Sequence, residues 1–232
     1  MGYRYTLLVK TSSKMNNAKE EFSDLAYIDV KFENPYDLFK DWYKEACLFS
    51  TAMPNALCLA TVSKDMQVSA RHLVLRRIED DGFVIYTDNR SRKTRELEEV
   101  PTAAMCFLWA YLNDKGQRVA RQVRIEGDVV VLGKDSYADL YEKDKLFCKI
   151  RAYICRQDQE VDWNDLKARH DQLLNDVRLN KKSLPMPDHF IGYKMVPRAI
   201  EFYYARDTLI GDRILFERDD PSCPWTYKRI AA

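Results

Sequence analysis

Three neighbouring segments read Arg71-His-Leu-Val-Leu-Arg76, Gly82-Phe-Val-Ile-Tyr-Thr87 and Ser91-Arg92-Lys93. The first two are short apolar runs typical of strands. Beside them lie four cations and three hydroxyls, namely Arg71, Arg76, Arg92, Lys93, Tyr86, Thr87 and Ser91. This composition favours a phosphorylated, planar ligand held by side chains, because glycine-rich phosphate loops use backbone groups instead. The alternative for each single cation is a solvated charge at a strand edge.

Further strand patterns surround these segments. We expect strands at Ala56–Ser63, Gln67–Ile78, Phe83–Thr87, Thr102–Trp109, Val119–Leu132, Phe190–Val196, Ile200–Ala205, Asp212–Arg218 and Trp225–Ile230. Most of the earlier ones are joined by short turns, which indicates an antiparallel meander. Such a sheet is expected to close on itself, since an open edge invites aggregation. The predicted fold class is therefore mainly β: a β-barrel with peripheral helices.

Helices are expected around the strands. Asn34 is a good cap for a helix that begins at Pro35 and carries an apolar face. A short helix capped by Ser91 begins within the third segment and ends before Pro101. Two more helices are predicted at Ser136–Tyr153 and Asp162–Leu179. Residues 1–30 are polar and aperiodic, so they are expected to form a poorly ordered leader, with 31–232 as a single domain.

Composition excludes several classes of function. The formal net charge of +1 argues against a general nucleic-acid binder. No apolar run has the length of a membrane span, and no signal peptide precedes the domain, so we expect a cytoplasmic protein without a membrane partner. The six cysteines form no C-x-x-C pair, which suits reduced thiols. The three histidines show no metal-ligand spacing, so no metal site is expected.

A longer series of motifs extends over about 180 residues. After the three segments come Phe107-x-Trp109, Arg121-Gln122-Val123-x-x-Glu126-Gly127, Pro185-x-Pro187, Gly192-Tyr193, Ile200-Glu201-Phe202 and Asp212-Arg213. In this order they resemble the pyridoxine/pyridoxamine 5′-phosphate oxidases, which are FMN enzymes on the split-barrel fold. The resemblance implies an antiparallel FMN-binding split barrel, a homodimer and FMN as cofactor.

The resemblance also implies a set of cofactor-binding residues. Arg71, Arg92 and Lys93 would meet the FMN phosphate, as bidentate guanidinium contacts suit a dianion. The remaining positions in this chain are the backbone of Leu73, Val74, Leu75 and Arg76, together with Tyr86, Thr87 and Gln122. A second subunit would supply Gln157, Tyr203 and Arg213. Tyr203 replaces the family's usual tryptophan, and Asp158 stands where the family has serine, which places an anion near the phosphate.

The substrate side departs from the family pattern. The family holds the substrate phosphate with a lysine, a tyrosine and an R-P-x-x-S-Q segment. The corresponding positions here are Arg76, Leu140 or (with a one-residue slip) Tyr141, and Asp144-Lys-Leu-Phe-Cys148-Lys. The family's R-L-H-D-R reads Leu209-Ile-Gly-Asp-Arg213. We therefore predict Arg76 and Tyr141 as substrate residues and assign no catalytic residue. The alternative is that a neighbouring cation, Lys143, Lys145, Lys149 or Arg151, takes over the phosphate.

The expected function is that of an FMN-dependent oxidase of vitamin B6 metabolism. It would oxidise a small phosphorylated pyridine, pyridoxamine or pyridoxine 5′-phosphate, to pyridoxal 5′-phosphate, with activity reduced by the altered substrate positions. One alternative is a non-catalytic FMN- or pyridoxal-phosphate-binding paralogue. Another is a flavin reductase of the same fold. The motifs do not separate these three.

Overall fold

The structure, a computed structural model, describes residues 23–50 and 53–232. Its centre is one sheet of nine strands, and all strand pairings in the described part are antiparallel. The order is β2-β1-β5-β6-β7-β4-β3, with β8 on β7 and β9 on β8. The strands are β1 (Ala56–Val62), β2 (Val68–Val74), β3 (Arg77–Ile78), β4 (Phe83–Asp88), β5 (Thr102–Leu112), β6 (Arg118–Leu132), β7 (Phe190–Arg206), β8 (Asp212–Glu217) and β9 (Thr226–Ile230).

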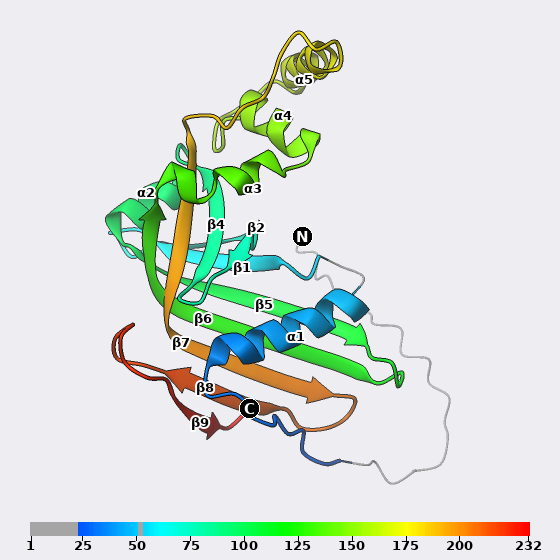
Figure 1. The fold of residues 1–232 in the computed structure, drawn as a ribbon, viewed down its shortest axis with the longest axis vertical. Helices are drawn as coiled ribbons and strands as arrows, with labels where there is room; N and C mark the ends of the chain where they lie inside the picture. The colour runs from blue at the N-terminus through cyan, green and yellow to red at the C-terminus, as the bar shows by residue number, and fades with distance from the viewer. Residues whose placement is uncertain (1–22, 51–52) are drawn as a thin grey trace, which may run out of the picture.

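Strand β7 joins the two ends of the molecule (Figure 1). It pairs with β6 along its length, with β4 near its start and with β8 near its end. We expected two strands here, and that prediction is wrong. The register shifts at Gly127, opposite Pro197, so the chain passes the proline with a bulge rather than a break. A Cβ on Gly127 would lie 2.1 Å from the oxygen of Val196, so this close approach requires glycine.

The predicted strand Gln67–Ile78 is also divided in the structure. Leu75 and Arg76 lie between β2 and β3 and leave the ladder. The nitrogen of Leu75 donates to Asn55 (2.8 Å), and that of Arg76 donates to Val84 (2.9 Å). The kink therefore carries the chain from the β1 side of the sheet to the β4 side. The antiparallel barrel prediction is confirmed as a half-barrel, whose two sides are linked here by this crossing segment.

Helix α1 (Pro35–Phe49) covers the broad face of the sheet, where Figure 1 shows it lying across β5 and β6. Asn34 caps it as predicted, since its side chain accepts a bond from the nitrogen of Tyr36 (3.0 Å). Its apolar face meets the aromatic core, in which Phe39 packs edge-to-face against Phe107 at 5.1 Å between ring centroids. Such pairs add to the burial of large apolar rings, so α1 and the sheet share one core.

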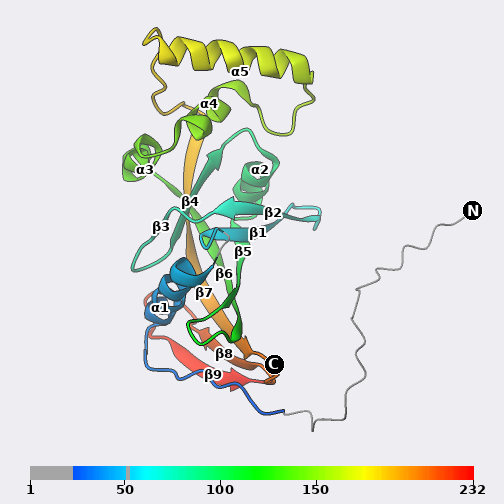
Figure 2. The same cartoon turned by 90° about the vertical axis from the view of Figure 1, so that its right-hand side faces the viewer.

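The other helices gather at the opposite end from β8 and β9 (Figure 2). They are α2 (Arg92–Glu99), α3 (Ala138–Glu142), α4 (Leu146–Ile154) and α5 (Trp163–Arg178), with a 3₁₀ turn at Lys134–Ser136. The prediction of one helix over Ser136–Tyr153 is wrong, because the chain turns between α3 and α4. Asp144 lies in this turn and is almost fully buried. The break thus brings a carboxylate toward β4.

The predicted leader is described only from residue 23 onward, since residues 1–22 lie outside the described part. Contrary to the expected boundary at residue 30, Ala26 and Ile28 are buried. The nitrogen of Ile28 donates to the Asp212 carboxylate (2.6 Å), so this segment is fastened to β8. In the described part, no helix has both the length and the apolar character needed to span a membrane.

Candidate cofactor and substrate site

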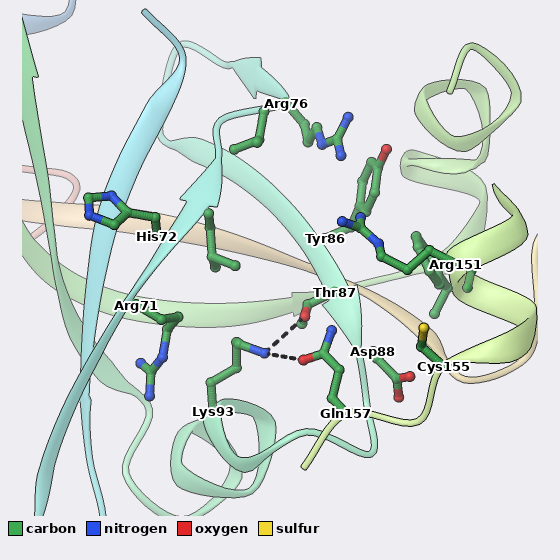
Figure 3. A pocket seen from close by; sticks show the side chains of 14 residues that line it. Arg71, His72, Arg76, Tyr86, Thr87, Asp88, Lys93, Arg151, Cys155 and Gln157 are labelled. Carbon is green, nitrogen blue, oxygen red and sulfur yellow. Dashed lines mark hydrogen bonds between the residues drawn. The ribbon is translucent and has the colours of Figure 1, made fainter. Parts of the chain in front are cut away.

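A cavity of about 310 Å³ opens where β2, β4, α2 and α4 meet. Figure 3 shows it from close by. Eight of the predicted site residues line it: Arg71, Leu73, Val74, Arg76, Tyr86, Thr87, Lys93 and Gln157. Arg151, which the sequence offered only as an alternative, lines it as well, and five others were missed by the sequence reasoning: His72, Asp88, Ala152, Cys155 and Phe190. Arg151 lies in the last turn of α4 and Cys155 caps the end of that helix, so the places of both residues depend on where the helix ends.

Lys93 lines one end of the cavity. Its side-chain nitrogen donates to Gln157 Oε1 (2.7 Å), Ser91 Oγ (3.0 Å) and Thr87 Oγ1 (3.3 Å). The residue is only 7% exposed, and no carboxylate of the described residues lies within ion-pair distance of it. Burial, followed by the nearby charge of Arg71, lowers the pKa of Lys93 below 10.5. A buried cation with only neutral partners favours an anionic ligand.

The two predicted phosphate arginines are held by Glu96 of α2. Arg92 Nε donates to one oxygen of Glu96 (2.7 Å), and Arg71 Nη2 lies 3.3 Å from the other. Burial alone would raise the pKa of Glu96, but hydrogen bonds from Thr61, Ser69 and Arg92 lower it to about 2. Arg71 still lines the cavity, whereas Arg92 does not. At this end Lys93 is thus the cation most available to a ligand.

Asp158 lies beside the start of α2. Its carboxylate accepts a bond from the backbone nitrogen of Arg92 (2.6 Å), the first residue of the helix, while the predicted cap Ser91 makes no side-chain cap bond. Arg95 approaches the same oxygen to 3.7 Å. A negative charge suits a helix N-terminus. The Asp158 carboxylate therefore has a structural role at the start of α2.

The opposite end of the cavity contains an ion pair. Arg76 stacks over the ring of Tyr86, with its guanidinium carbon 4.1 Å from the ring centroid. Arg76 Nη1 donates to one oxygen of Asp144 (2.9 Å), and the Tyr86 hydroxyl donates to the other. The pKa of Tyr86 is raised, mainly by burial and then by this bond to Asp144. The carboxylate therefore engages both Arg76 and Tyr86 at this end.

The other predicted substrate residue, Tyr141, does not line the cavity. It is buried against Phe190, and its hydroxyl donates to the oxygen of Leu184 (3.4 Å). Among the basic residues considered as alternatives, only Arg151 borders the cavity. Lys143 pairs with Asp139, and Lys149 donates to the oxygen of Glu142. The structure therefore does not support Tyr141 as a substrate contact and brings Arg151 forward.

Three predicted cofactor residues form a separate row on the sheet. Gln122 of β6 is opposite Tyr203 of β7, and Tyr203 is opposite Arg213 of β8. None of the three lines the cavity. Within one chain, Gln157 lines the cavity, whereas Gln122 lies beside Tyr203 on the neighbouring strand. Leu75, whose backbone was expected along the flavin, does not line the cavity, and its side chain is buried in the core.

The cavity fits an FMN phosphate in its donor chemistry. Lys93 supplies a buried charge without a carboxylate partner, and Gln157, Ser91 and Thr87 surround it with groups that can reorient toward phosphate oxygens. The apolar side chains of Leu73, Val74 and Phe190 could contact a flat ring system. Within the described residues no cluster of histidine, cysteine and acidic side chains has the make-up of a metal site.

The chain is similar to known proteins over most of its length. Residues 44–168 match the model of the pyridoxamine 5′-phosphate oxidase family, and residues 190–232 match the C-terminal dimerisation region of pyridoxine 5′-phosphate oxidase. A pyridoxine/pyridoxamine 5′-phosphate oxidase of Acaryochloris marina is 30% identical over 97% of this chain and 99% of its own.

Solved structures of related proteins have a similar fold. The chain is similar to PhzG of Burkholderia lata, solved in complex with tetrahydrophenazine-1-carboxylic acid, with a TM-score of 0.76 and 27% identity over 91% of this chain and all of that one. A related FMN-binding protein of Nostoc punctiforme shares the fold, with a TM-score of 0.66 and 15% identity over 88% and 100% of the two chains. This chain belongs to the pyridoxamine 5′-phosphate oxidase family, a family of oxidoreductase kind, and its cofactor is FMN.

Proposed function

We propose that the protein is an FMN-dependent oxidase that acts as a homodimer on a small, planar substrate. The observation that carries this proposal is Lys93, a buried cation whose three partners are neutral oxygens. A phosphate dianion would supply the missing charge, and charge-assisted hydrogen bonds of this kind are about twice as strong as neutral ones. Bound FMN would accept hydride from the substrate and pass the electrons to dioxygen.

The row of Gln122, Tyr203 and Arg213 supports a cofactor site shared between two subunits. The row lies on neighbouring strands away from the cavity of its own chain, and Tyr203 and Arg213 fall in the matched dimerisation region. On the neighbouring strand β5, Leu108 is paired with Gln122 and is largely exposed. This part of the sheet therefore has an exposed apolar surface. A two-fold axis would bring each row to the partner's cavity and produce two equivalent sites.

We further propose that the vitamin B6 phosphates are poor substrates. The names of the relatives suggest pyridoxamine and pyridoxine 5′-phosphate. However, Arg76 is neutralised by Asp144, and Tyr141 does not line the cavity. The PhzG relative, solved with a carboxylic acid, indicates that a similar scaffold accepts compounds without phosphate. Oxidation of B6 phosphates should therefore be weak even when FMN is fully bound.

The test is an assay of purified, FMN-loaded protein for peroxide release with pyridoxamine and pyridoxine 5′-phosphates. We expect stoichiometric FMN uptake and slow peroxide release. Failure of the wild-type protein to bind FMN at micromolar concentration would refute the cofactor assignment in this chain. Tight FMN binding without peroxide from any amine or alcohol would favour the non-catalytic paralogue. Oxidation of a reduced nicotinamide instead would favour a flavin reductase.

A further inference from the structure

Five charged side chains line the cavity, and they differ in whether they already have a partner. Arg71 is paired with Glu96, Arg76 with Asp144, and Asp88 with Arg90. Lys93 and Arg151 have no carboxylate partner among the described residues. Paired charges contribute little net field to the cavity. The two remaining cations therefore determine which anions it attracts.

Lys93 and Arg151 serve different parts of the cavity. Lys93 is bonded to Gln157 at one end, whereas in Figure 3 Arg151 extends from α4 toward Tyr86 at the other. Arg151 in the last turn of α4 and Cys155 at the cap of that helix both line the cavity. If Lys93 holds the FMN phosphate, Arg151 is left facing the substrate.

Asp144 determines what the substrate end can accept. Its two oxygens engage Arg76 and the Tyr86 hydroxyl, and its side chain is 8% exposed. A phosphate entering here would have to displace this carboxylate from both partners and would then lie near it. Two like charges in a buried site repel strongly. Asp144 thus acts against a dianion, while the ion pair leaves Arg151 as a single net positive charge.

We infer that the substrate end of the cavity selects planar substrates carrying one carboxylate, with Arg151 as the anion-binding residue and Asp144 as the residue that excludes phosphate. The guanidinium of Arg151 can contact a carboxylate through two parallel hydrogen bonds. Together, Arg76, Asp144 and Arg151 carry a net charge of +1, which matches a monoanion. This inference rests on the proposed FMN function, because the substrate end is defined relative to the FMN phosphate at Lys93.

The experiment uses FMN-loaded protein and three unreactive probes that share a benzyl group: phenylacetate, benzyl phosphate and benzyl alcohol. Binding is followed by the change in flavin absorbance. We expect wild-type protein to bind phenylacetate at least about tenfold more tightly than benzyl phosphate. The Arg151→Met variant should lose about tenfold or more for phenylacetate and little for benzyl alcohol, with its FMN affinity unchanged.

The Asp144→Asn variant tests the exclusion of phosphate by a gain of binding. It keeps the size of the side chain but frees the charge of Arg76, so benzyl phosphate should bind about tenfold or more tightly than to wild type. Matched controls are Lys143→Met and Asp139→Asn, which remove exposed charges in the same helical segment outside the cavity. Neither control should alter the preference between the probes.

Three results would overturn the inference. One is tighter binding of benzyl phosphate than of phenylacetate to the wild-type protein. Another is a loss of FMN affinity in Arg151→Met as large as its loss for phenylacetate, which would place Arg151 at the cofactor. The third is absence of phenylacetate binding to FMN-loaded protein. A wild-type protein that takes up no FMN would instead refute the proposed function, and the inference with it. Should Asp144→Asn fail to fold, the wild-type preference and Arg151→Met still decide.

Discussion

The two ends of the cavity treat negative charge in opposite ways. At one end Lys93 is buried among neutral oxygens and has no carboxylate partner in the described part of the chain. At the other end Arg76 already has one, because Asp144 bonds both to it and to Tyr86. A buried cation without a counter-charge is stabilised by an anionic ligand, whereas a completed ion pair resists one. A family scaffold can thus keep its cofactor chemistry while changing its substrate.

The largest expected effect comes from breaking the cofactor end. Replacement of Lys93 by methionine should weaken FMN binding by roughly tenfold to more than a hundredfold, since a charge-assisted bond to phosphate contributes about 1.5–3 kcal/mol. Titration with FMN followed by fluorescence quenching measures this loss. Lys134→Met, which removes an exposed lysine paired with Asp188, is the control. Equal FMN affinity in Lys93→Met and wild type would contradict the role of Lys93.

The same lysine predicts a pH dependence. Lys93 binds phosphate in its charged form, and burial lowers its pKa below 10.5. FMN affinity should therefore fall as the pH rises toward that value, beginning earlier than for an exposed lysine. Titrations at several alkaline pH values measure the decline. In Lys93→Met this part of the dependence should disappear, and its persistence would mean that another group titrates.

The second expected effect concerns the row Gln122, Tyr203 and Arg213. If each site takes this row from the partner, Arg213→Ala should bind FMN poorly although its own cavity is intact. Mixing Arg213→Ala with Lys93→Met protein, with exchange of subunits, should restore binding. Random mixed dimers have one intact site each, so about a quarter of all sites should recover.

Native mass spectrometry and FMN titration of the mixture measure this recovery. Self-mixed samples of either variant are the control and should recover none. No recovery in confirmed mixed dimers would show that each site is built from a single chain.

The next prediction concerns the ion pairs that hold the arginines of the cofactor end. The pKa of Glu96 is lowered to about 2, so it stabilises the fold above about pH 4.5, and this contribution is lost as pH falls toward 2. Glu96→Gln should therefore reduce the free energy of unfolding at neutral pH by roughly 2–3 kcal/mol. Urea unfolding of FMN-free protein at pH 7 and pH 3.5 measures this. A penalty of equal size at both pH values would argue against the charge as its cause.

Sequence patterns predicted the elements whose signals are local. Asn34 and Pro35 mark the start of α1, and the alternating runs mark most strands. The kink at Leu75 and Arg76 has no such signal, because hydrogen bonds to Asn55 and Val84 create it. The break between α3 and α4 likewise depends on Asp144 reaching Arg76, which lies 68 residues earlier. Contacts between distant segments override local propensity in both places.

In the candidate site too, local sequence patterns predicted some residues, and contacts between distant segments determined the others. Lys93 and Thr87 were found from their segments, and the structure brings them together. The subunit that supplies Gln157 depends on how the segment after α4 lies against the start of α2, and no local sequence pattern records this contact. Gly211 is a further example. A Cβ there would lie 2.4 Å from the ring of Tyr203, so restoring the family's histidine would require the ring to move. The two replacements are coupled through space, and single-position reasoning treats them separately.

The smallest expected effect distinguishes charge from structure at Asp158. This carboxylate caps α2 through the nitrogen of Arg92, and its charge also acts on Lys93. Asp158→Asn keeps an oxygen acceptor for the cap but removes the charge, so helix stability should change little. A bound phosphate would then lose a like-charge neighbour, and FMN should bind about two- to fivefold more tightly, as expected for a partly exposed charge. The control is Asp162→Asn, because Asp162 caps α5 away from the cavity. Unchanged FMN affinity in Asp158→Asn, with unchanged thermal stability in both variants, would mean that Asp158 is too distant from the phosphate to oppose it.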